Sequence, residues 1–168
     1  GAIEDSAVDT LQIIPPGSPS LGVVSTGRIV HLAGDVYAFV TEALNADSAK
    51  RIFLYTITIS AAGAISDAVV DSLELAVGRF TPDLIKISDR HYAIAYSWLN
   101  QGSIKTIIIE PDGTIGSVTD TLEFEDDYCG PAPFIISITE GILAIAYEGS
   151  GYDGWLKTIG PVVVPTVS

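Results

Sequence analysis

Short apolar stretches alternate with polar, glycine-rich ones along most of the chain. The apolar stretches are rich in Ile, Val, Tyr and Thr, which is typical of β-strands. No stripe of apolar residues with a 3.6-residue period extends over ten residues, so the pattern predicts no helix. Between the stretches, Gly34-Asp35, Ala62-Gly63 and Asp112-Gly113 have the residue types that favour tight hairpin turns. The pattern therefore predicts an all-β fold.

One arrangement of strands recurs three times with a period of about 50 residues. The repeated threonines Thr56, Thr106 and Thr158 lie 50 and 52 residues apart. The other matching segments are Arg28–Leu32, Leu84–Ile87 and Phe134–Ile138 (strand a); Val36–Val40, His91–Tyr96 and Ile142–Tyr147 (strand b); Phe53–Ile59, Ile104–Ile109 and Trp155–Ile159 (strand c); and Gly1–Ile13, Gly63–Leu75 and Gly113–Phe124 (strand d). Internal repeats of this length indicate a repeat architecture.

A four-stranded unit of about fifty residues has the length of a β-propeller blade. We expect three four-stranded antiparallel sheets, with strand b between strands a and c. Residues 1–160 then form three blades, and residues 161–168 a tail or linker. The alternative is a β-sandwich, which explains the strands but not the repetition.

The repeat also resembles a known kind of sequence. Tyr92–Tyr96, Gly102–Ile107, Gly113–Ile115 and Asp120–Phe124 are similar to a tandem propeller repeat of long surface and secreted proteins of archaea and bacteria. The resemblance implies recently duplicated blades and brings no catalytic residue with it. The first copy departs from the pattern, because Tyr55 stands where the other copies have lysine.

Residues 1–13 match strand d, whereas nothing after Ile159 does. We expect residues 1–13 to complete the last blade, in cis or from a partner chain. Closed propellers have about 4–8 blades, so three blades predict a homodimer that closes a six-bladed ring. The alternative is that neighbouring blades of a longer chain close the ring; the absence of methionine favours a processed or excised piece.

Composition narrows the range of partners. The chain has 48% hydrophobic residues, but no apolar run approaches the roughly 18–20 residues that span a bilayer. A net charge of −13 argues against nucleic acid and anionic membranes. Cys129 is the one cysteine, so an internal disulfide and a cysteine zinc site are excluded. We expect an extracellular or cell-surface location.

Residues present in every copy belong to the scaffold, whereas residues present once are free to act in binding. The repeated Asp9, Asp71 and Asp120 and the repeated threonines are interpreted as turn or strand-pairing groups. The candidate ligand-binding residues occur once, in the b–c and d–a connections: Trp98, Asn100, Tyr128, Tyr152, Asp153 and Trp155. Aromatic rings with nearby amides and carboxylates suit a glycan or a protein ligand. The alternative is that these aromatics pack between blades.

The sequence contains no catalytic motif, so we predict that the chain is not an enzyme. No cofactor is predicted; Ca²⁺ at Asp126 and Asp127, beside Glu125, is a weak alternative that lacks the usual alternating spacing. A metal site of His31 and His91 requires the fold to bring them together. The leading hypothesis is a non-catalytic binding module. A purely structural repeat segment and a glycosidase or lyase fragment are the alternatives.

Overall fold

The computed structural model describes residues 9–11, 23–44, 49–77, 79–139 and 141–161. Each predicted strand a, b and c is present, and the described part of the chain contains a single short 3-10 helix. The strands are β1 (Val23–Ala33), β2 (Val36–Leu44), β3 (Lys50–Thr58), β4 (Asp71–Val77), β5 (Arg79–Lys86), β6 (His91–Trp98), β7 (Gln101–Ile109), β8 (Ile115–Glu125), β9 (Phe134–Thr139), β10 (Ile142–Glu148) and β11 (Gly154–Ile159).

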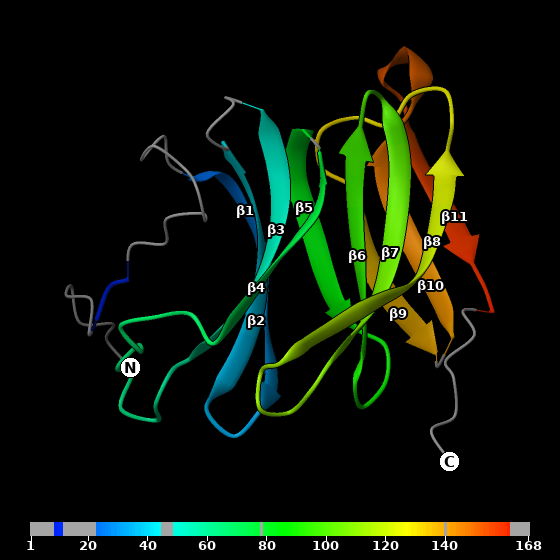
Figure 1. Ribbon diagram of the computed structural model, residues 1–168. Coiled ribbons are helices and arrows are strands. Elements are labelled where there is room, and N and C mark those ends of the chain that lie inside the picture. Colours follow the sequence, from blue (N-terminus) through cyan, green and yellow to red (C-terminus); the bar gives the residue numbers. More distant parts are fainter. Residues whose placement is uncertain (1–8, 12–22, 45–48, 78, 140, 162–168) are drawn as a thin grey trace, which may run out of the picture.

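The strands form three antiparallel sheets, which stand side by side in Figure 1. The first sheet has the order β1-β2-β3-β4, the second β5-β6-β7-β8, and the third β9-β10-β11. Strand b therefore lies between strands a and c in each sheet, as the sequence predicts. The third sheet lacks a strand d among the described residues.

The pairing register confirms that the three sheets are copies of one unit. In each sheet a small alanine of strand b lies between an aliphatic residue of strand a and a threonine of strand c. The three cross-strand rows are Val30–Ala38–Thr56, Ile85–Ala93–Thr106 and Ile136–Ala144–Thr158. Residues that match in the three sequence repeats therefore occupy the same position in the three sheets.

Two hydrophobic cores hold neighbouring sheets together. The core between the first and second sheets contains Val40, Leu54, Leu84 and Ile94, all fully buried. The core between the second and third sheets is lined by Ala93 and Ala95 on one side and by larger aliphatic residues of β9 and β10 on the other. Small side chains on strand b let the facing sheet approach closely enough for its larger side chains to fill the gap.

The repeated aspartates and threonines face one another across strand pairs, Thr56 with Asp71 and Thr106 with Asp120. In the first sheet, Asp71 and Thr56 also connect to the second sheet. Asp71 of β4 accepts a hydrogen bond from the Ile115 amide of the second sheet, N to Oδ2 2.9 Å. The Thr56 hydroxyl of β3 donates to the carbonyl of Gly113 at 2.7 Å. Gly113 has a φ of +93°, and an added Cβ would lie 3.3 Å from the Thr56 Oγ1. The β7–β8 hairpin of the second sheet is thus bound to the first sheet by backbone groups.

The N-terminal segment repeats this contact. Asp9 accepts from the Ile65 amide at 2.8 Å and from the Thr10 amide at 2.7 Å. Asp71 makes the corresponding pair of bonds, with Ile115 and Ser72. Asp9 therefore lies beside the first sheet as Asp71 lies beside the second. Most of the predicted strand 1–13, the connection 14–22 and the tail after Pro161 lie outside the described residues.

Candidate functional site

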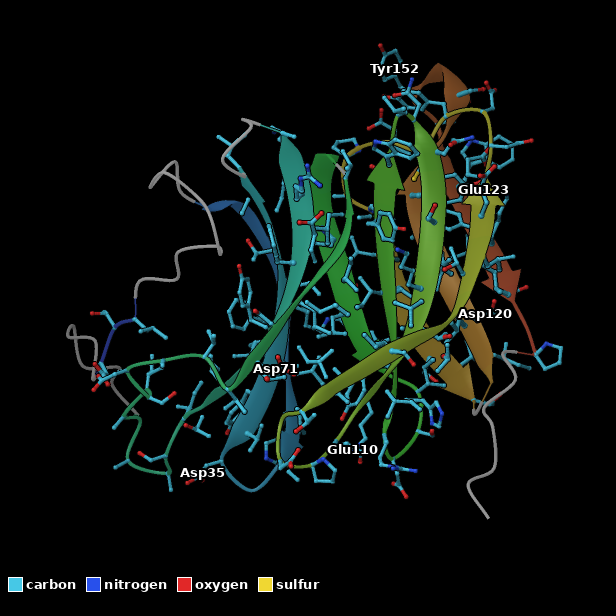
Figure 2. The ribbon with its side chains drawn as sticks, in the orientation of Figure 1. Asp35, Asp71, Glu110, Asp120, Glu123 and Tyr152 are labelled. Carbon is cyan, nitrogen blue, oxygen red and sulfur yellow. The ribbon has the colours of Figure 1, made fainter. Side chains whose placement is uncertain are left out.

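The connections that carry the candidate residues lie together at one end of the molecule, at the top of Figure 1. They are the β6–β7 turn, the β8–β9 connection and the β10–β11 connection, here called the loop end. Figure 2 shows Tyr152 at the outermost point of this end. The β1–β2 and β7–β8 connections lie at the opposite end of the molecule (Figure 1).

The β6–β7 turn holds apolar side chains out in solvent. Trp98 is 41% exposed and Leu99 is 69% exposed. Leu99 and Asn100 have φ values of 48° and 73°, as the two central residues of a type I′ hairpin turn require. Asn tolerates this conformation well, but leucine adopts it at a cost in backbone energy. An exposed leucine in a strained turn is poor for stability alone, which favours a role in binding.

The β10–β11 connection contains a 3-10 turn, Ser150–Tyr152. Gly151 and Tyr152 both have positive φ, of 82° and 63°. Tyr152 is 84% exposed, and its ring meets the ring of Tyr128 edge-on, with centroids 6.3 Å apart. The backbone of this turn therefore directs a large aromatic side chain away from the sheets.

The β8–β9 connection joins the two other loops into one surface. The Cys129 amide donates to the Asn100 carbonyl, and the Gly130 amide donates to the Glu148 carbonyl at 2.7 Å. The Tyr128 hydroxyl donates to Glu148 Oε1 at 3.2 Å. Backbone contacts therefore fix Asn100 and Tyr128 relative to one another, although they come from different connections.

Trp155 and Asp153 both contact the β10–β11 connection itself. Trp155 belongs to strand β11 opposite Tyr147, and its indole covers Gly149, where an added Cβ would lie 2.2 Å from Cδ1. The Asp153 carbonyl accepts from the Gly149 amide at 2.9 Å. Both residues therefore support the turn that carries Tyr152.

A charged cluster lies beneath the loop end, between the second and third sheets. Glu125 Oε2 accepts from the Tyr147 hydroxyl at 2.6 Å and from Lys157 Nζ at 2.9 Å. These two hydrogen bonds lower the pKa of Glu125 to about 2. Lys157 also donates to the Phe124 carbonyl at 2.7 Å, and Lys105 makes the equivalent bond to the Leu75 carbonyl of the first sheet. The lysine-to-carbonyl hydrogen bond thus recurs between neighbouring sheets, and Glu125 and Tyr147 add further hydrogen bonds to it in the cluster.

The acidic residues of the loop end do not assemble into an evident metal site. Within the described residues, no group of three or more His, Cys, Asp or Glu side chains is placed to hold an ion. The Asp127 amide donates to Glu125 Oε1 at 3.2 Å, so these two residues form a local turn. Burial raises the pKa of the Cys129 thiol to about 12, which disfavours the nucleophilic thiolate.

The two histidines have separate surroundings. His31 Nε2 donates to the Gly34 carbonyl at 2.7 Å, and its ring lies 5.0 Å from that of Tyr37. His91 is buried, with Nδ1 3.2 Å from the Ser88 hydroxyl. Neither contact contains the other histidine, so the structure does not assemble the His–His pair that the sequence left open.

Sequence reasoning missed two residues that the structure makes prominent. The sequence pattern does not single out Leu99, because an apolar residue next to Trp98 reads as part of the preceding strand; its position beside Asn100 in a two-residue hairpin is the signal that places it in the turn. Glu125 was considered only with the acidic run, since its partners Tyr147 and Lys157 are distant in sequence.

Comparison of the chain with protein-family models, curated proteins and solved structures gives no match. In the parts of the chain that the structure describes, no helix is both long and apolar enough to cross a bilayer.

Proposed function

We propose that this chain is a non-catalytic recognition module of β-propeller type, which binds a glycan at its loop end. One observation carries the proposal. Trp98 at the end of β6, together with Leu99 and Tyr152 on the connections, exposes large apolar surface that a rigid scaffold holds in place. Leu99 and Tyr152 have positive φ. Binding residues concentrate on such loops, because a scaffold that already orders them lowers the entropy lost on binding.

The chemistry of the loop end suits a neutral sugar chain. Aromatic rings stack on the apolar faces of sugar rings, while the amide of Asn100 and the carboxylate of Asp153 offer hydrogen bonds to hydroxyl groups. The net charge of −13 disfavours a polyanionic ligand. A protein ligand uses the same exposed apolar residues, and the experiment separates the two.

The test screens the full chain on an array of neutral and charged glycans, and then measures affinity for the strongest hit by calorimetry. Trp98→Ala and Tyr152→Ala should each weaken binding by at least ~10-fold, the size expected for a central aromatic contact. Trp98→Phe and Tyr152→Phe each keep an aromatic ring at the position and should retain most of the affinity. Thermal midpoints should change little, because both side chains are exposed.

Two results would contradict the proposal. An array without a hit, combined with a protein captured through the same two aromatics, would replace the glycan with a protein ligand. Equal affinity of the alanine variants and the wild type would remove the loop end as the site. The location at the cell surface or outside the cell stays a prediction, and so does the resemblance to surface-protein repeats.

A purely structural role is the second candidate, and one observation favours it. The outer face of the third sheet carries exposed aliphatic residues, Ile136 at 55% and Leu156 at 71% exposure, which suits stacking of further units. The glycosidase or lyase alternative has less support. Glu125, a carboxylate beneath the loop end, has a pKa that is shifted strongly downward, whereas a general acid needs a raised pKa.

A further inference from the structure

Strand β11 offers a sheet edge without a partner in the part of the chain that the structure describes. The third sheet has the order β11-β10-β9, whereas the equivalent strands β3 and β7 pair on that side with β4 and β8. An edge of this kind presents unpaired backbone N–H and C=O groups, which readily add another strand. The missing strand is therefore of type d.

The face of the third sheet that points away from the second sheet is also uncovered. It carries Ile136, Ile138 and Leu156, which are 55%, 53% and 71% exposed. Their equivalents in the second sheet are Ile85, Ile87 and Ile104, which are only 5%, 8% and 3% exposed because the third sheet covers them. The uncovered face therefore has the composition of an interface between sheets.

A groove of about 330 Å³ lies between the second and third sheets, and Asp120 and Thr106 line it. Asp120 Oδ1 accepts from its neighbour Thr121 at 2.7 Å, as Asp71 Oδ1 does from Ser72. Asp71 Oδ2 has a second donor in the next sheet, the Ile115 amide; among the described residues no such donor reaches Asp120 Oδ2. Figure 2 shows Asp71 and Asp120 at corresponding places on β4 and β8.

The segment that fits these three features is residues 1–13 of a second copy. Its sequence is that of a strand d, with Asp9-Thr-Leu11 matching Asp120-Thr-Leu122. Asp9 already makes the contacts of a strand d with the sheet that follows it, through the Ile65 amide. In Figure 1 residues 9–11 and β11 lie on opposite sides of the molecule, so Asp9 and Leu11 are not placed to pair with β11 of their own copy.

We propose that β11 and the uncovered face of the third sheet bind residues 1–13 and the first sheet of a second copy, so that two copies close a ring of six sheets. The register follows from the pairs Thr106↔Asp120 and Ile104↔Leu122. Thr158 lies opposite Asp9 of the partner subunit, and Leu156 opposite Leu11 of the partner subunit. The third sheet of each copy then pairs with the first sheet of the other copy. Both interfaces are the same, and together they close the ring.

The first sheet supplies the complementary surface. Its face away from the second sheet carries Ile29, which is 51% exposed, whereas the equivalent Leu84 and Ile135 are fully buried. On the same face Phe39 is half-buried and Phe53 is buried, in a cluster with Ala43 and Tyr55, so the exposed apolar surface of the first sheet is centred on Ile29. Six sheets lie within the range of about 4–8 that closed propellers use. The interface therefore continues the two sheet-on-sheet contacts that already exist within one copy.

The first measurement is the mass of the full chain by light scattering across a range of concentrations. The expected mass is twice the 17.6 kDa of one chain, and it should stay constant once the ring has closed. Asp120→Ala should weaken the dimer by roughly 10-fold or more, because it removes an acceptor of a charge-assisted hydrogen bond. A monomer at every concentration, or a mass that keeps rising, would overturn the proposal.

The register is tested in a chain whose native cysteine is removed by Cys129→Ala. Two variants that each carry one introduced cysteine are mixed, so that any disulfide must join different copies. Leu11→Cys mixed with Leu156→Cys should give a covalent dimer on a non-reducing gel. Thr10→Cys mixed with Leu156→Cys is the matched control, since neighbouring side chains of a strand point to opposite faces. Cross-linking of the control pair alone, or of neither pair, would contradict this register. The assay does not involve the glycan, so it stands or falls separately from the proposed function.

Discussion

Thr56→Val tests whether single hydroxyl groups hold neighbouring sheets together. Thr56 is fully buried, and its hydroxyl donates to the Gly113 carbonyl of the next sheet at 2.7 Å. Valine keeps the shape of the side chain and removes the donor, which leaves the carbonyl of the buried Gly113 without that partner. An unsatisfied buried polar group costs about 1–3 kcal/mol, so the free energy of unfolding should fall by that amount.

Urea unfolding followed by circular dichroism and by the fluorescence of Trp98 and Trp155 measures this change. With an m value of about 2 kcal/mol/M, the midpoint should fall by about 0.5–1.5 M. Thr58→Val is the control, because Thr58 is half-buried on the same face of β3 and the structure describes no hydrogen bond of its hydroxyl. Its effect should stay within about 0.5 kcal/mol. Equal effects of the two variants at one protein concentration would refute the reasoning.

Three further outcomes follow from the structure. Gly113→Ala should destabilise the chain by at least ~1 kcal/mol more than Gly34→Ala in thermal or urea unfolding, since both glycines have positive φ but only at Gly113 would the new Cβ crowd Val70, at 3.0 Å; equal losses would mean that the hairpin is not packed as described. Native Cys129 should resist a thiol reagent at pH 8 and react only in urea, because it is buried and its pKa is about 12; rapid labelling of the folded chain would contradict this burial. The Glu125 pKa of about 2 lies below its ordinary value of 4.5, so the stabilising contribution of Glu125 is present above about pH 4.5 and is lost as the pH falls toward 2. The difference in unfolding free energy between wild type and Glu125→Gln should shrink over that window. A difference independent of pH would argue against the cluster.

The strands and their order could be predicted because both depend on local pattern. Alternation in Tyr92–Tyr96 and its copy Leu143–Tyr147 marks strand b, and three repeats of one unit permit only one order in each sheet. Burial of both faces of the second sheet also follows, since β6 is apolar on every side.

The contacts between sheets could not be predicted in this way. Asp71 and Ile115 are 44 residues apart, and Thr56 and Gly113 are 57 apart, so no local signal links them. Repetition showed that these residues matter to the scaffold but not what they touch. At the loop end, Trp98, Tyr152 and Trp155 are 41%, 84% and 50% exposed, and the indole of Trp155 also covers Gly149. This contact depends on which face of β11 carries the indole. The sequence does not determine that face, because it does not determine the length of the connection before β11.

The aspartate contacts give each sheet a direction. One side of a sheet offers a carboxylate from its last strand, and the other side offers the backbone N–H groups of its hairpin. Two like sides have no complementary groups, so sheets add only head to tail, as monomers do in a polar filament. A gene that gains or loses a whole unit preserves every such contact, whereas a break inside a unit leaves an aspartate without its donor. Lengthening of this kind of chain by duplication therefore proceeds in steps of about fifty residues.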